Sequence, residues 1–408
     1  MKQLFEKTNL IKLAKWLLLS LSIGIVGGLI GFSFCIAISA VTHVREGNSF
    51  TILFLPLAAV LSVGLNELLK TSGIATNDVV VSAKRGKVVN HLLLPAIFIS
   101  STITHLFGGS AGREGAALQM GGSAASLLSK VFKLDEYESR ILIKCGMASF
   151  FAALFGTPLA ACVFAIEVAF DKSSWLKSTF PALVASNSAY YVSFILGNEG
   201  ERFNVSAPVY GLSLIFKSIV ISICAGLVGS LFCLSLKYFK RFAKLHIKNA
   251  YLIAITGSVA VVLLTIIVGN QDYNGSGSHL IEKVFTGEHI NSYDFALKAL
   301  FTVLTVSASL KGGEIVPSLS IGATLGGFLA IIMGMNVAIG AAIGMAVLFS
   351  TVTKCPIASI FICYEMFGIT VLPLCVIAIV VSVFISSKKG LYEEKQNQLS
   401  ITNLIKKA

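Results

Sequence analysis

The fold is decided by a segment that occurs twice, as GMASFFAALFGTPLAACVFAIE at 146–167 and as GMAVLFSTVTKCPIASIFICYE at 344–365. Each copy holds Gly-Met-Ala, then nine residues, then Pro-x-Ala and, after six more residues, Glu, at a constant offset of 198 residues. The paired residues are Pro158 with Pro356, Ala160 with Ala358, and Glu167 with Glu365. An internal repeat of this kind predicts a chain built from two related halves.

The composition is that of a membrane protein. Of the 408 residues, 55% are hydrophobic and only 13% are charged, and the mean hydropathy is +0.84. Barrel strands would alternate apolar and polar residues, so long apolar runs predict helices. The first run is too long for a cleaved signal peptide and is followed by many more, which predicts an all-α polytopic membrane protein. The apolar stretches are 16–42, 51–69, 92–108, 140–170, 176–197, 208–236, 251–269, 294–310 and 319–386.

The distribution of basic residues predicts the topology. Lysines flank the apolar region at both ends, and basic residues near a membrane span favour the cytoplasmic side. Both termini are therefore expected in the cytoplasm, with an even number of crossings of a cell membrane. The net charge of +12 follows from such loops, so no nucleic-acid partner is expected. The flanking lysines are Lys2, Lys7, Lys12 and Lys15 before the first span, and Lys388, Lys389, Lys395, Lys406 and Lys407 after the last.

We expect one membrane domain over residues 1–408. Its first half would cover about 16–236 and its second half about 250–392, separated by the basic connection 237–249. The tail 393–408 is too short for another folded domain. If each half crosses the membrane an odd number of times, the halves are inverted, and their broken helices meet at a site near the midplane.

The segment GGSAGREG at 108–115 predicts an anion site. Its glycines allow close approach of the backbone, and the free N–H groups of the helix that follows attract negative charge. Glu114 lies in this segment, where a carboxylate can occupy the place of an anion when charged and leave it when protonated. The alternative is that Glu114 pairs with Arg113 at the edge of a loop.

The second half repeats this plan with LKGGEIVP at 310–317, which makes Glu314 a second candidate proton carrier. Its alternative is an ion pair with Lys311. Two further carboxylates, Glu167 and Glu365, close apolar helices at matching positions, where we expect hydrogen bonds to backbone groups, with a role in transport as the alternative. Taken alone, the polar residues of 72–77 and Tyr392 suit a turn or an interface anchor as well as a site.

The sequence contains no motif for ATP hydrolysis, hydrolytic catalysis or metal binding. There is no Walker A pattern, nucleophile elbow or H-E-x-x-H, so we expect no enzyme activity, no cofactor and transport driven by an ion gradient. His91 and His105 lack the spacing and partner residues of a metal site, so no metal is expected.

Four motifs together resemble the CLC family of anion channels and transporters, over nearly the whole membrane domain: Gly112-Arg-Glu-Gly115, Gly-Thr-Pro-Leu-Ala at 156–160, Gly-Gly-x-x-x-Pro at 312–317, and Gly390-Leu-Tyr392. The resemblance implies a homodimer with one pore in each subunit and two inverted halves, and with a tail this short no cytosolic CBS domains are expected. It also implies that Glu114 is the gating carboxylate and Tyr392 the central tyrosine. The implied anion site comprises Gly112, Arg113, Gly115, Ala75, Thr76, Asn77, Gly313, Ile315, Val316 and Tyr392.

Three positions resemble the fluoride/proton antiporter branch of this family. Asn77 ends the run Gly-Ile-Ala-Thr-Asn, Glu314 stands where chloride-handling members usually carry an apolar residue, and Val168 replaces a second inner glutamate. The resemblance therefore implies an antiporter that exports fluoride from the cytoplasm, with protons as the second substrate. A chloride or nitrate channel, or a chloride/proton exchanger, on the same scaffold is the alternative. A membrane scaffold or sensor without transport would leave the two carboxylate-bearing loops without a purpose.

Overall fold

A computed structural model describes residues 2–387 and 390–392. Within these residues the chain is all-helical, and its one extended contact is an isolated bridge between Gly112 and Gly313. The predicted tail 393–408 and the basic residues Lys388, Lys389, Lys395, Lys406 and Lys407 lie outside the described residues.

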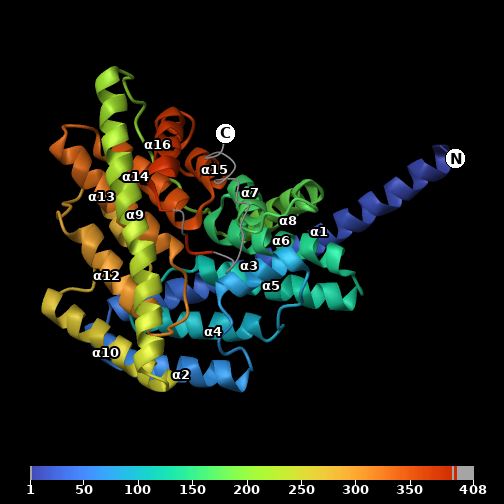
Figure 1. Ribbon diagram of the computed structural model, residues 1–408, viewed down its shortest axis with the longest axis horizontal. Coiled ribbons are helices and arrows are strands. Elements are labelled where there is room, and N and C mark those ends of the chain that lie inside the picture. The colour runs from blue at the N-terminus through green and yellow to red at the C-terminus, as the bar shows by residue number, and fades with distance from the viewer. Residues whose placement is uncertain (1, 388–389, 393–408) are drawn as a thin grey trace.

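The described residues form two series of eight α-helices, with one 3₁₀ helix in the first series; they are drawn in blue to green and in yellow-green to red in Figure 1. The first series is α1 Lys2–Glu46, the 3₁₀ helix η1 Ser49–Phe54, α2 Leu55–Leu68, α3 Thr76–Arg85, α4 Leu93–Leu106, α5 Glu114–Val131, α6 Glu136–Phe155, α7 Pro158–Val168 and α8 Trp175–Ile195. The second series is α9 Leu212–His246, α10 Ala250–Val268, α11 Ser278–Thr286, α12 Asp294–Ser307, α13 Ile315–Ile332, α14 Val337–Thr353, α15 Pro356–Phe367 and α16 Leu372–Ile385.

The order of long and short helices is similar in the two series. The long helix α9 stands in the second series where α1 stands in the first. The basic residues of 237–244 continue α9 instead of forming a linker. The backbone geometry of one turn repeats as well. Gly156 and Lys354 both adopt the left-handed backbone conformation, with φ of 69° and 62°.

The repeated motif forms a break between two helices in each half. Gly156 and Lys354 end α6 and α14 in the left-handed conformation, and a proline then occupies the first turn of α7 and of α15. The intervening N-cap residues Thr157 and Cys355 share nearly the same dihedral angles, φ −119° and ψ 73° against φ −118° and ψ 73°. The apolar stretch 140–170 therefore contains two helices, α6 and α7, and the stretch 319–386 contains four, α13 to α16, rather than single spans.

Five helical segments are long and apolar enough to cross a membrane, judged by length and composition over the described residues. They are 10–46, 49–68, 212–246, 250–268 and 315–332. Large apolar side chains such as Leu57, Leu263 and Ile267 are exposed along such helices, and hydrocarbon would cover them in a bilayer. The short helices α7 and α15, one from each series, lie side by side where the two series meet (Figure 1).

Glycines let helices α13 and α14 pack with their backbones in contact. A Cβ atom added at Gly344 would overlap the carbonyl oxygen of Gly322, and one added at Gly326 would overlap that of Gly340. The first half has the same device, because a Cβ atom at Gly121 would overlap the carbonyl oxygen of Gly146. Small residues commonly allow this close approach between membrane helices.

We expect Gly344→Ala to destabilise the protein by about 3 kcal/mol, the upper end of the usual cost of overpacking, because a backbone carbonyl cannot rotate away. Gly211→Ala is the matched control, since a Cβ atom there has nothing within 4 Å. Thermal unfolding of the two purified variants in one detergent checks this. Equal melting temperatures would show that α13 and α14 can separate without cost.

Candidate anion site around Glu114

The two glycine-rich loops meet at equivalent positions of the two halves. The amide N of Gly112 donates to the carbonyl of Gly313 at 2.7 Å, and the amide N of Gly313 donates to the carbonyl of Gly112 at 2.6 Å. This antiparallel pair brings the first residues of α5 and α13 together. Since helix N-termini carry partial positive charge, the two helices converge as an anion site requires.

Glu114 is the first residue of α5, and its carboxylate lies at this junction. The side chain is fully buried, and Oε1 accepts a short hydrogen bond from the amide N of Val316 in the first turn of α13. The carboxylate also lies against Gly313, where an added Cβ atom would stand 3.0 Å from its Cδ. The Oε2 atom has no hydrogen-bond partner within the described part of the chain.

Arg113 does not pair with Glu114. The alternative interpretation, in which Glu114 forms an ion pair with Arg113 at the edge of a loop, does not fit this geometry. The guanidinium donates to Glu201 Oε1 at 2.7 Å and lies 5.9 Å from the centre of the Phe155 ring. The side chain of Arg113 is thus held by the loop that follows α8. What Arg113 contributes to the junction is its backbone, as the N-cap of α5.

Glu314 is the N-cap of α13, the position that Arg113 occupies in α5, so Glu114 and Glu314 are not equivalent residues. Its Oε1 atom accepts from Lys240 Nζ at 3.1 Å. The expected alternative partner, Lys311, instead donates to the carbonyl of Ile74 at 3.0 Å. The Glu314 side chain is 11% exposed, against 43% for Lys240.

The start of α3 approaches the same junction. A Cβ atom added at Gly115 would stand 2.9 Å from Gly313 Cα and 3.3 Å from Thr76 Oγ1. Thr76 is the first residue of α3 and accepts from Gln119 Nε2 at 3.0 Å. Ala75 caps the helix and Asn77 follows within it, so residues 75–77 present a third helix N-terminus to the glycine loops.

Tyr392 is buried at the end of the described chain, with 7% of its surface exposed. The neighbouring Leu391 donates its amide N to the carbonyl of Val352 at 2.9 Å, which anchors this segment to α14. The Tyr392 hydroxyl has no hydrogen-bond partner in the described residues, and Glu314 and Glu114 are among its charged neighbours. A hydroxyl buried in this way can donate to an anion.

Glu167 and Glu365 have the structural role that sequence reasoning favoured. Glu167 accepts from the amide N atoms of Ile357 and Ala358 at 3.2 and 2.7 Å, at the start of α15. Glu365 accepts from those of Leu159 and Ala160 at 3.0 and 2.8 Å, at the start of α7. Each carboxylate thus satisfies the free N–H groups of a helix in the other half.

Three residues of this neighbourhood escaped the sequence analysis. Gln119 orients Thr76, Lys240 pairs with Glu314, and Glu201 holds Arg113. Lys240 belongs to a basic run that topology alone could explain, and the chain separates it from Glu314 by 74 positions. The sequence signal for this ion pair was that Lys240 and Glu314 are two opposite charges that both lie beside apolar helices.

Comparison with known proteins identifies relatives that match most of the chain. The family described as "Voltage gated chloride channel" matches residues 66–387. A "Chloride/fluoride channel protein" of Pseudomonas syringae pv. tomato is 30% identical over 94% of this chain and 87% of its own length. An "H(+)/Cl(-) exchange transporter" of Vibrio cholerae is 28% identical over 62% of this chain and 58% of its own.

Solved structures agree with this match. A CLC-type fluoride/proton antiporter superposes with a TM-score of 0.89 and 35% identity, over 94% of this chain and 98% of that chain. A slow cyanobacterial Cl⁻/H⁺ antiporter superposes at 0.79 with 20% identity, over 92% of this chain and 96% of that chain, a likeness that concerns the fold. With its helix order, its glycine loops and these matches, the chain belongs to the CLC family of voltage gated chloride channels and related transporters.

Proposed function

We propose that this CLC protein is a fluoride/proton antiporter that exports fluoride from the cytoplasm. The observation that carries the proposal is the position of the Glu114 carboxylate, which is buried between Gly112 and Gly313 and accepts from the start of α13. A carboxylate in that position takes the place of an anion. Its protonation state then decides whether an anion can enter.

Proton coupling follows from this competition. Charged Glu114 fills the junction of α5 and α13 and excludes other anions. When the carboxyl group takes up a proton it loses its attraction to the helix N-termini, and it leaves the junction with the proton as an anion moves in. One site thus exchanges a proton for an anion, and neither passes without the other.

Fluoride as the anion rests on the donors near the junction and on the relatives. Fluoride is small and strongly hydrated, so it needs strong hydrogen-bond donors in place of water. Asn77 and the Tyr392 hydroxyl are the side-chain donors that we assign to this task, beside the backbone of Gly112, Gly115, Gly313, Ile315 and Val316, with Glu314 as the second carboxylate of the site. The structural relative at 35% identity is a fluoride/proton antiporter.

We further propose that both termini lie in the cytoplasm and that the protein acts as a homodimer in the cell membrane. The lysines that precede the first span support the orientation. Resemblance to the family supports the dimer, with one transport path in each subunit.

Purified protein in liposomes tests the function. We expect fluoride loaded inside to leave faster than chloride, with uptake of protons measured in the same vesicles and abolished by a proton ionophore. Proton uptake with chloride efflux of equal rate would make the protein a chloride/proton exchanger. Chloride or nitrate efflux without proton movement would make it a channel.

A further inference from the structure

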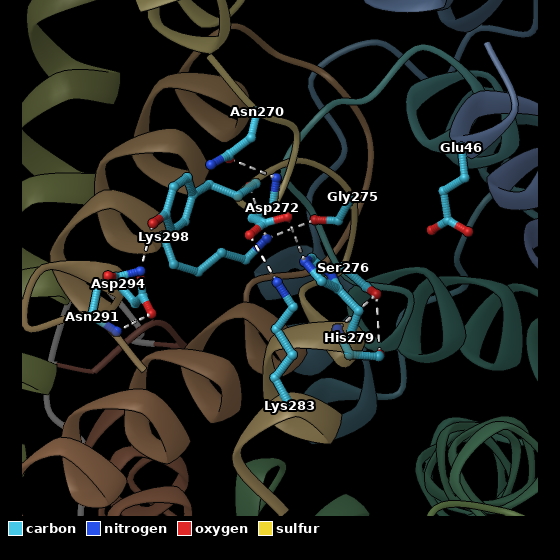
Figure 2. Close-up of polar contacts among 12 residues, drawn as sticks. Glu46, Asn270, Asp272, Gly275, Ser276, His279, Lys283, Asn291, Asp294 and Lys298 are labelled. Atoms are coloured by element: carbon cyan, nitrogen blue, oxygen red, sulfur yellow. Dashed lines mark hydrogen bonds and ion pairs between the residues drawn. The ribbon is translucent and has the colours of Figure 1, made fainter. Parts of the chain in front are cut away.

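Lys298 is a fully buried lysine on α12 that no step of the proposed exchange uses. Its Nζ atom donates to the carbonyls of Gly275 and Tyr273 at 2.8 and 3.1 Å. It also donates to Ser110 Oγ at 3.0 Å. Figure 2 shows the lysine beside Gly275. The first two acceptors belong to the turn before α11 and the third to the glycine loop 108–112, so one side chain joins these two segments.

The directions of the hydrogen bonds around Ser110 show that its hydroxyl accepts from Lys298. The Thr302 hydroxyl donates its one proton to the carbonyl of Lys298 at 2.9 Å, so it accepts in its 3.0 Å contact with Ser110 Oγ. Ser110 therefore donates its own proton to Thr302, and its oxygen accepts from the lysine. The three acceptors match the three N–H donors of a lysine ammonium group. Lys298 thus has no donor left for a ligand, and its role is one of position.

Two more hydrogen bonds hold the same loop to the second series. The amide N of Ser110 donates to Thr305 Oγ1 on α12 at 3.0 Å. Asn274 Nδ2, from the turn before α11, donates to the carbonyl of Gly108 at 2.8 Å. The loop is therefore fixed by α12 and by the turn before α11, the two elements that the lysine joins. Glu114 begins α5 two residues after this loop, so the position of its carboxylate depends on where the loop lies.

The other glycine loop is tied in an equivalent way. Lys311 stands two positions before Gly313, as Ser110 stands two positions before Gly112, the residue with which Gly313 pairs. The Lys311 amine donates to the carbonyl of Ile74 at 3.0 Å, in the turn before α3. A lysine amine thus joins each loop to the turn before a short helix of the other series. The same connection, made by lysines at different positions, favours a role in holding the loops.

The exchange at Glu114 makes this connection necessary. While charged, the carboxylate accepts from Val316 and so links the start of α5 to the start of α13. That link is lost when Glu114 leaves the junction. The backbone pair between Gly112 and Gly313 remains, and the rest of the first loop depends on its contacts with α12 and the turn before α11. A binding site keeps its geometry only when a surrounding shell of contacts holds it.

We infer that Lys298 is a positioning residue of the anion site. Through Ser110 it holds the loop 108–112 in the shape that binds an anion while Glu114 is away from the junction. The lysine itself touches neither the anion nor the proton. The inference rests on the proposed anion site at the junction of α5 and α13. It rests neither on fluoride as the anion nor on coupling to protons.

Ser110→Ala tests this inference, because it separates the loop from Lys298 and leaves the lysine its two carbonyl acceptors. In the Glu114→Gln background no carboxylate competes for the junction, so calorimetry measures anion binding to the purified full chain without transport. We expect sodium fluoride to bind about tenfold more weakly after Ser110→Ala, the factor that corresponds to one charge-assisted hydrogen bond, because the anion must then order the loop. Ser222→Ala, which removes a buried hydrogen bond between α9 and α16, should leave the affinity unchanged.

Lys298→Met shows whether Ser110 acts through the lysine. Methionine keeps an unbranched side chain in a space that has no room for a larger one, since a Cβ atom on Gly277 would stand 2.6 Å from Lys298 Cε. We expect Lys298→Met to weaken fluoride binding at least as much as Ser110→Ala does. In the Lys298→Met background, Ser110→Ala should add less than about twofold, because both changes break one connection. If Lys298→Met does not fold, the affinity of Ser110→Ala decides alone.

Unchanged affinity in Ser110→Ala would overturn the inference, and so would an equal loss in Ser222→Ala, which would mark a general effect on the fold. Losses that add in full in the double variant would show that Ser110 acts without Lys298, with the same consequence. Failure of the liposomes to move fluoride would refute the proposed antiport alone. Sodium chloride would then replace sodium fluoride as the probe, with the same ratio of affinities expected.

Discussion

Fluoride efflux from liposomes should fall to background in Glu114→Gln, and proton uptake should vanish with it. Glutamine has nearly the shape of glutamic acid but cannot release a proton, so the exchange at the junction of α5 and α13 loses its proton carrier. The amide also places an N–H group near the amide N of Val316, where the carboxylate oxygen now accepts. Removal of a group that acts in every cycle typically costs a factor of about 100 or more.

The control for this prediction is Glu288→Gln, an exposed glutamate that accepts from Thr286 at 3.1 Å. Its efflux and proton uptake should match those of the unmutated protein, measured at equal amounts of folded protein. If Glu114→Gln kept proton-coupled fluoride efflux, the proton would have to travel on another group, and the proposed role of Glu114 would be wrong.

Much of the fold could be predicted because short sequence motifs recur at a constant offset in the two halves. The match between 146–167 and 344–365 predicted two related halves, and in the structure each copy forms the same break between two helices. The prediction of a linker at 237–249 was wrong for residues 237–246, which continue helix α9. When a long helix ends in basic residues, its sequence resembles that of a membrane span followed by a linker, and the segment 237–249 was interpreted in this way.

The site was predicted in part for a similar physical reason. Glu114 could be found because glycines, a carboxylate and a following helix are adjacent in sequence. The partners of Glu314 and Arg113 could not, because Lys240 and Glu201 reach them only through packing between distant helices. Proximity in the sequence suggested that Lys311 pairs with Glu314 and that Arg113 pairs with Glu114. In the fold, Lys311 donates to the carbonyl of Ile74 and Arg113 donates to Glu201.

Loss of the Glu167 carboxylate should destabilise the protein more than loss of any exposed carboxylate. Glu167→Ala leaves the amide N atoms of Ile357 and Ala358 unpaired in a buried place, at a cost of about 2 to 5 kcal/mol when two groups are summed. Glu365→Ala should cost less, because Glu365 is only half-buried and water can replace its oxygens. Unfolding followed in mixed micelles measures both.

The double variant then tests whether the two caps act as a unit. Each carboxylate bonds the helix of the other half, so α7 and α15 are held by both, and the second loss should cost less than the first once their interface has opened. Glu138→Ala is the control, since its ion pair with Lys15 is partly exposed and surface pairs contribute about 0 to 1 kcal/mol. A Glu167→Ala variant as stable as Glu138→Ala, yet with fluoride efflux lost per folded molecule, would instead assign Glu167 to the transport path.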